Sequence, residues 1–96
     1  MKPSQALHLY RDQICHAVGQ CRVSNPRVFG SVLHGTDQEG SDLDLLVDAM
    51  PGATLFDLGG LQADLEEMLG IPVDVLTPND IPLKFRAQVL LEARSL

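Results

Sequence analysis

Two short apolar segments, each interrupted by a single aspartate, constrain the fold of this chain more than any other feature. Residues 43–47 have the sequence LDLLV, and residues 71–76 have the sequence IPVDVL. Such runs are too short for a buried helix and have the usual length of a strand. A strand that is almost entirely apolar is typical of a sheet with helices packed on both faces. The two segments therefore predict a central sheet covered by helices.

Helical periodicity appears on either side of these strands. Residues 4–18 carry apolar side chains at steps of three and four, which predicts an amphipathic helix with Ser4 as its N-cap and Gly19 as its end. The same spacing predicts a second helix over residues 58–69, and Gly70 directly follows its last turn. Both helices have one apolar face that a sheet can bury.

The rest of the chain divides into turns, a loop, one further strand and a last helix. These are a turn at 24–26, a short strand at 28–29 ending at Gly30-Ser31, a loop at 34–41, a turn at 77–80 and a helix at 82–93. The resulting order is helix, strand, strand, helix, strand, helix. It predicts a small mixed α/β (α+β) sandwich formed by a single domain, residues 1–96.

Charge narrows the classes of function. Lys and Arg total 7 and Asp and Glu total 13, so the net charge is −6. An acidic domain does not attract a phosphate backbone through its overall field, and we therefore expect no direct nucleic-acid binding. If the chain handles nucleotides, divalent cations must offset the local negative charge. A basic protein partner is the other natural consequence of this charge.

The first residues and the cysteines indicate a compartment. The N-terminus meets Arg11 and Asp12 before any long apolar run develops, so we expect no signal peptide, no membrane span and a cytoplasmic location. Cys15 and Cys21 form neither a zinc-ligand set nor a disulfide framework. We interpret them as core thiols in a reducing compartment.

Asp42, Asp44 and Asp74 are the candidate catalytic residues. Asp42 and Asp44 flank Leu43 at a strand start, and residues two apart in a strand point to the same face. Two adjacent carboxylates repel one another unless a cation, a shared proton or water intervenes, and hard oxygen ligands favour magnesium or manganese. This pair alone is also compatible with a solvated strand start. Asp74 lies between two valines, where it either faces water or completes a metal site with the pair; we favour the metal site.

Gly30-Ser31 is the candidate phosphate-binding turn. Glycine lets the backbone approach a ligand closely, and consecutive N–H groups in a tight turn can hold phosphate oxygens. Ten residues in a glycine-bounded loop separate Ser31 from Asp42, so the turn can lie beside the metal site. The other charged residues are interpreted as turn, loop or surface positions: Asp37, Glu39, Asp48, Asp64, Glu66, Glu67, Lys84, Arg86 and Arg94.

The segment GSVLHGTDQEGSDLDLLV resembles the signature of the polymerase beta-type nucleotidyltransferase superfamily. The short chain, Gly35, and the segment from IPVDVLT to EARSL resemble the minimal nucleotidyltransferases of prokaryotes. The resemblance implies that Asp42, Asp44 and Asp74 bind metal and act in catalysis. It also implies that the nucleotide is bound by Gly30, Ser31 and Ser41.

The resemblance further implies a reaction and a partner. Members of the family use two magnesium ions to transfer a nucleoside monophosphate from a triphosphate such as ATP to a hydroxyl. Minimal members are commonly encoded beside a HEPN-domain ribonuclease toxin, bind it as antitoxins and in some cases attach AMP to a tyrosine. A small-molecule acceptor is the weaker alternative, because it needs a further domain. Homo- or hetero-oligomers remain open.

One departure from the family keeps a second function open. Many minimal members have basic residues in the loop after Gly-Ser, whereas this chain has Val32, Leu33 and His34. His34 can donate a hydrogen bond to phosphate when it is protonated. The alternative is a non-catalytic binding module that neutralises a toxin by complex formation.

Overall fold

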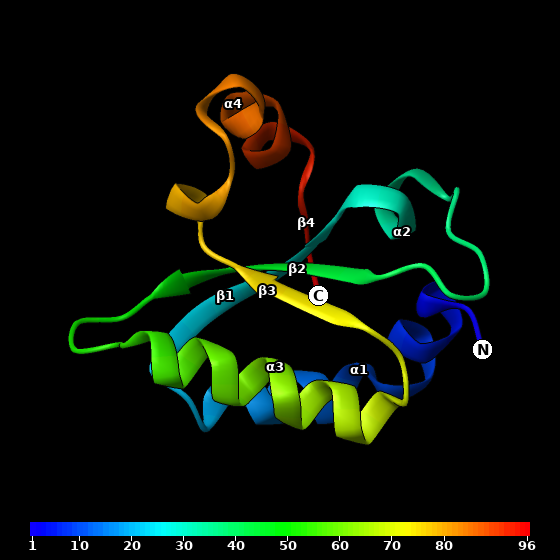
Figure 1. Cartoon of the computed structure of the whole chain (residues 1–96), viewed down its shortest axis with the longest axis horizontal. Coiled ribbons are helices and arrows are strands. Elements are labelled where there is room, and N and C mark those ends of the chain that lie inside the picture. Colours follow the sequence, from blue (N-terminus) through cyan, green and yellow to red (C-terminus); the bar gives the residue numbers. More distant parts are fainter.

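The computed structural model describes all 96 residues and has a four-stranded mixed sheet of order β3-β2-β1-β4 (Figure 1). Strand β1, Val23–Phe29, runs antiparallel to β2, Leu43–Ala49. Strand β3, Val73–Leu76, runs parallel to β2, and the two-residue β4, Arg94–Ser95, pairs antiparallel with the other side of β1. The sequence prediction of a small mixed sheet with helices is confirmed.

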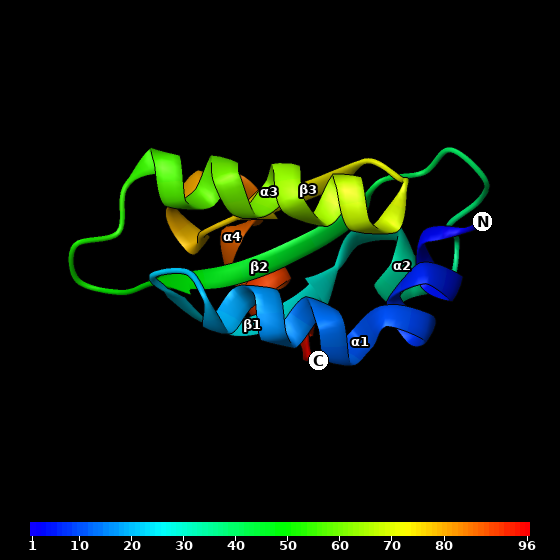
Figure 2. The ribbon, with the colours of Figure 1, turned by 90° about the horizontal axis from the view of Figure 1, so that it is seen from below.

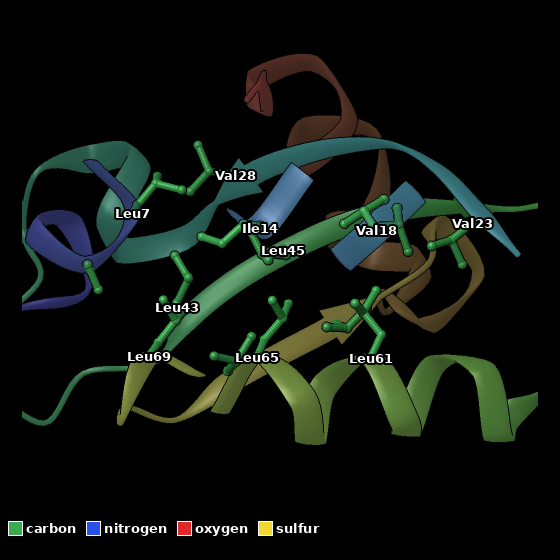
Figure 3. Packing of buried hydrophobic residues seen from close by; sticks show 14 residues of the cluster. Leu7, Ile14, Val18, Val23, Val28, Leu43, Leu45, Leu61, Leu65 and Leu69 are labelled. Atoms are coloured by element: carbon green, nitrogen blue, oxygen red, sulfur yellow. The ribbon is translucent and has the colours of Figure 1, made fainter. Parts of the chain in front are cut away.

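Two long helices cover one face of this sheet. They are α1, Pro3–Gly19, and α3, Leu55–Leu69, which lie below the strands in Figure 1 and run side by side across them in Figure 2. Fourteen buried residues form one apolar cluster between the helices and the strands (Figure 3). Strand β2 contributes Leu43, Leu45 and Val47 to this cluster. Because side chains alternate along a strand, Asp44 and Asp48 point to the opposite face.

The opposite face is only partly covered. It carries the short helix α2, Gly30–His34, the 3-10 turn η1, Pro78–Asp80, and helix α4, Leu83–Glu92 (Figure 1). Leu46 on this face is fully buried, whereas α4 has no buried residue at all. The prediction that helices cover both faces of the strands therefore holds fully for one face only.

The helix ends agree with the sequence in one case and differ in another. Gly70 has φ +69° and follows α3 in the left-handed conformation, as predicted. Helix α3 begins three residues earlier than expected because Thr54 and Asp57 form a reciprocal capping box. The prediction of Ser4 as an N-cap is wrong, since the cap position is Lys2 and Ser4 lies in the first turn of α1.

The predicted turn at residues 24–26 is also wrong. This segment lies inside β1 as an irregularity, where the register with β2 shifts between Ser24 and Arg27 and Asn25 has φ +53°. The pairing resumes at Arg27, so the chain bends without leaving the sheet. Helix α2 and strand β4 were not predicted, because five and two residues are too short to show a period.

Four charged residues assigned to turns or the surface instead bind other parts of the fold. Asp37 is only 7% exposed and accepts the N–H of Ser4 at 2.8 Å. The hydrogen bonds from Ser4 hold the pKa of Asp37 below its ordinary value, and they satisfy a free donor of the first turn of α1. The interpretation of Asp37 as a solvated loop charge is therefore wrong.

The other three are Asp48, Glu66 and Arg86. Asp48 lies within β2 and forms an ion pair with Arg27, so it is not a turn residue. Glu66 accepts the N–H of Val73 at 3.2 Å, which satisfies a donor on the outer strand of the sheet. Arg86 is half-buried and donates to the carbonyl of Ile81 at 3.1 Å.

Two further findings concern the cysteines and the helix lengths. Cys15 and Cys21 are unpaired, as expected, but both are half-buried rather than fully buried in the core.

None of the helices combines the length and the apolar character that crossing a membrane would require.

Candidate active site

Asp42, Asp44 and Asp74 converge on the partly open face of the sheet. The parallel register of β2 and β3 pairs Asp44 directly with Asp74, and Asp42 lies two residues before Asp44. One carboxylate oxygen from each residue lies within 4.8 Å of the others. Asp42 is exposed and the other two are half-buried. The predicted convergence is present, while the role of these residues as metal ligands stays a prediction.

The cluster lacks positive charge. Burial raises the pKa of Asp44 to about 6, and the negative charges of Asp74 and Asp42 add to the effect. The ion pairs of the protein lie elsewhere and involve Glu39, Asp48 and Glu92. Three carboxylates that repel one another and have no basic partner fit the oxygen-ligand chemistry of a divalent cation such as magnesium.

Gly30 lies against this cluster at the beginning of α2. The preceding residue, Phe29, pairs with Asp44 across β1 and β2. Gly30 has φ +72°, and a Cβ atom built on it would be 2.2 Å from Oδ2 of Asp44. The structure therefore places the start of the Gly-Ser motif at the rim of the aspartate cluster, as expected.

The two serines have identifiable backbone or loop contacts. The carbonyl of Ser31 accepts the N–H of Thr36 at 2.9 Å, which closes the end of α2. The hydroxyl of Ser41 accepts the N–H of Gln38 at 2.9 Å within the loop before β2. Contact of Gly30, Ser31 and Ser41 with a nucleotide stays a prediction.

Packing against the core accounts for Val32, one of the two apolar residues that depart from the family pattern, whereas the other, Leu33, lines a hollow. Val32 is partly buried and packs against the apolar core, so its position in α2 favours an apolar side chain. Leu33 lines a hollow of about 400 Å³ between α2 and the end of α4. Neither position requires a cation for the fold.

The same hollow contains two basic side chains, His34 and Arg94. Nε2 of His34 lies 3.2 Å from Oε2 of Glu92, which joins the end of α2 to the end of α4. Arg94 reaches the hollow from β4. Arg94 is exposed, as predicted, but the hollow that it lines was not predicted, because a two-residue strand gives no periodic signal.

Comparison with known proteins identifies the family. Residues 10–96 match the family described as "Nucleotidyltransferase domain". A protein of Methanocaldococcus jannaschii named "Putative protein adenylyltransferase MJ0435" is 42% identical over 71 residues, which cover 74% of this chain and 76% of that protein. A second, "Putative protein adenylyltransferase MJ1217" of the same organism, is 37% identical over 60 residues, covering 62% of this chain and 61% of the relative.

Solved structures agree with this match. One described as "Structure of putative minimal nucleotidyltransferase" is 38% identical, has a TM-score of 0.85 and is aligned over 97% of this chain and 95% of its own. Another, the toxin-antitoxin complex MntA-HepT, shares the fold alone, with 18% identity, a TM-score of 0.67 and coverage of 92% and 69%. The chain thus belongs to the nucleotidyltransferase domain family, as one of its minimal members, and is an enzyme of the nucleotidyltransferase class.

Proposed function

We propose that residues 1–96 form one magnesium-dependent protein adenylyltransferase domain that acts as an antitoxin in the cytoplasm. It would transfer AMP from ATP to a tyrosine hydroxyl of a cognate HEPN ribonuclease toxin. The observation that carries the proposal is the cluster of Asp42, Asp44 and Asp74, whose oxygens lie within 4.8 Å of one another. The names of the Methanocaldococcus relatives support a protein acceptor.

The transfer step balances with the groups in this cluster. The acceptor oxygen forms a bond to the α-phosphorus of ATP while the bond from that phosphorus to the bridging oxygen breaks, and pyrophosphate leaves. Asp42 and Asp44 would hold the cations, and Asp74 would act as a further ligand or take the hydroxyl proton. Two magnesium ions, when bound, would supply the positive charge that polarises the phosphate and stabilises the leaving group. Gly30, Ser31 and Ser41 would contact the nucleotide.

Helix α4 is the surface that we assign to the toxin. Four of its apolar side chains are exposed: Leu83, Phe85, Leu90 and Leu91. Residues 82–96 contain three basic residues and one acidic residue, whereas residues 1–81 contain four basic and twelve acidic residues. A partner with an apolar groove and an acidic rim would complement this segment. Helix α4 lies on the face of the sheet opposite to α1 and α3 (Figure 1), and Asp44 points to that same face, so such a partner would be held on the side of the sheet that carries the cluster.

The catalytic proposal is tested by labelling. The purified protein is incubated with the toxin, ATP labelled at the α-phosphate, and magnesium, and label on the toxin is measured. We expect labelling that EDTA abolishes, that Asp44→Asn removes and that Asp48→Asn preserves. Asp48 is the matched control because it is on the same strand but pairs with Arg27 outside the cluster. Strong labelling by the Asp44→Asn protein would refute the assigned site.

The exposed apolar face of α4 also favours the second candidate, a binding module that neutralises a toxin without turnover. The double variant Asp42→Asn/Asp44→Asn separates the two functions. If modification is required, the variant binds the toxin but does not protect against it, and wild type protects at well below equimolar amounts. Equal protection by variant and wild type at matched stoichiometry would establish the binding module.

A further inference from the structure

We propose that Gly30 is a positioning residue for Asp44: its missing side chain leaves the space that the Asp44 carboxylate occupies in the aspartate cluster. The inference rests on the proposed metal site. It assigns Gly30 a role toward the cluster that is separate from contact with a nucleotide.

The contact follows from the pairing of β1 with β2. Phe29, the last residue of β1, is the register partner of Asp44, and Gly30 begins α2 immediately after it. The turn into α2 therefore occurs beside the Asp44 side chain. On the other side of Asp44, the register partner in β3 is Asp74. Asp44 thus lies between the Gly30 backbone and a second carboxylate.

An added methyl group at Gly30 would collide with the carboxylate itself. A Cβ would be 2.2 Å from Oδ2 of Asp44, 3.1 Å from its Cγ and 3.4 Å from its Cβ. The overlap is largest at the end of the side chain and smallest near the backbone. The chain can relieve it by rotating the Asp44 carboxylate, because no backbone atom is among these nearest neighbours. We therefore expect Gly30→Ala to displace the Asp44 carboxylate from its position in the cluster more than it disturbs the fold.

Backbone conformation alone does not explain the requirement, and the chain contains a control. Gly35 ends α2 with φ +71°, against +72° for Gly30, so both positions have the positive φ that strains an L-residue. A Cβ at Gly35 meets nothing within 4 Å. Gly30→Ala and Gly35→Ala therefore both place an L-residue at positive φ, and only Gly30→Ala adds a contact with Asp44.

The test measures metal binding without turnover. Manganese is titrated into wild type, Gly30→Ala, Gly35→Ala and Asp44→Asn, and the free ion is followed by electron paramagnetic resonance. We expect manganese binding to weaken at least about 10-fold in Gly30→Ala, in the range typical of residues that orient metal ligands. Binding by Gly35→Ala should stay within about twofold of wild type, because its backbone strain lies away from the ligands.

The outcomes separate the two proposals. If Gly30→Ala binds manganese as tightly as wild type does, the proposed role of Gly30 is wrong and the proposed metal site still stands. If wild type binds no more manganese than Asp44→Asn does, the proposed metal site is wrong. In that case the contact between Gly30 and Asp44 is tested by measuring thermal stability instead of metal binding. This second measurement also gives a result if the Gly30→Ala protein does not fold.

That second measurement uses Asp44→Ala, which removes the colliding atoms. In an Asp44→Ala background, Gly30→Ala should lower the melting temperature no more than Gly35→Ala does. In the wild-type background, Gly30→Ala should lower it further or abolish folding. An equal effect of Gly30→Ala in both backgrounds would overturn the inference.

Discussion

The two faces of strand β2 differ in what they contribute to the protein. Leu43, Leu45 and Val47 point into the core beneath α1 and α3, while Asp44 and Asp48 point to the partly open face. The first set removes apolar surface from water, which is the main source of stability in folding. On the second face, Asp44 is held near two like charges, which raises its pKa and disfavours its ionised form. One strand thus combines a stabilising face with a face on which Asp48 is paired with Arg27, whereas Asp44 has no basic partner and needs a cation to offset its charge.

The largest expected effect is the contrast in stability between Leu45→Ala and Asp44→Asn. Leu45 is fully buried, and its truncation should lower the free energy of unfolding by about 2–5 kcal/mol. Asp44→Asn removes a repelled charge and should not lower that free energy in metal-free protein. Urea denaturation with EDTA present measures both. A loss in Asp44→Asn as large as that in Leu45→Ala would show that the open face also stabilises the fold.

The pH dependence of stability sharpens the same comparison. The folded pKa of Asp44 is about 6 and its ordinary value is 3.8, so between these values the folded protein binds more protons at this site than the unfolded chain does. The contribution of Asp44 to stability therefore falls as pH rises from about 4 to about 6, and is constant above that. We expect wild type to lose stability relative to Asp44→Asn across this window in metal-free urea denaturation. A constant difference between the two proteins would contradict the raised pKa.

Metal affinity should show the reverse trend with pH. A proton on Asp44 competes with a cation for the same oxygens, so the affinity for magnesium should fall below a pH of about 6. If one proton is displaced, the expected slope is about tenfold per pH unit. Calorimetric titrations at pH 5, 6 and 7.5 measure it. Affinity that does not change over this range would place the ion away from Asp44.

The assignment of α4 as the toxin-binding surface can be tested with two phenylalanines from helices on opposite faces of the sheet (Figure 1). Phe85 of α4 is 53% exposed and Phe56 of α3 is 90% exposed. Phe85→Asp should weaken toxin capture by about tenfold or more, as expected for an interface anchor. Phe56→Asp should leave capture unchanged, and neither variant should change manganese binding. Weaker capture by Phe56→Asp, with no effect of Phe85→Asp, would move the interface to α3.

The smallest expected effect concerns the loop that tethers α1. Asp37 accepts the N–H of Ser4 in the first turn of α1, so its carboxylate acts as a cap from a distant part of the chain. Asp37→Ala should lower the free energy of unfolding by about 0.5–2 kcal/mol, the usual effect of losing a helix cap. Asp37→Asn keeps an acceptor and should lower it less. Equal losses in the two variants would show that the charge, rather than the hydrogen bond, stabilises this contact.

The sequence predicted the features that have a period and missed those that depend on register. The sequence predicts strands at residues 43–47 and 71–76 because apolar side chains surround a single aspartate in each. That Asp42 and Asp44 share a face follows from the alternation of side chains along a strand. The contact between Gly30 and Asp44 could not be predicted, because it depends on which residue of β1 pairs with Asp44. The contact of Asp37 with Ser4 joins residues 33 positions apart and has no local signal.

Short elements were missed for a related reason. Helix α2 and strand β4 contain five and two residues, and the irregularity in β1 was interpreted as a turn because Asn-Pro favours one. Helix α2 carries His34 and strand β4 carries Arg94, and both residues line the hollow beside α4. The aspartates of the site could thus be predicted from the sequence, whereas the hollow between α2 and the end of α4 could not.

The central claim is that Asp42, Asp44 and Asp74 hold a divalent cation on the open face of the sheet. Crystals grown with manganese and a non-hydrolysable ATP analogue test it through the anomalous scattering of the metal. We predict an anomalous peak bounded by oxygens of these three residues, with the α-phosphate directed at the same ion. A peak at Glu39, Asp57 or Asp64 instead, or none at the cluster while the nucleotide is bound, would contradict the account.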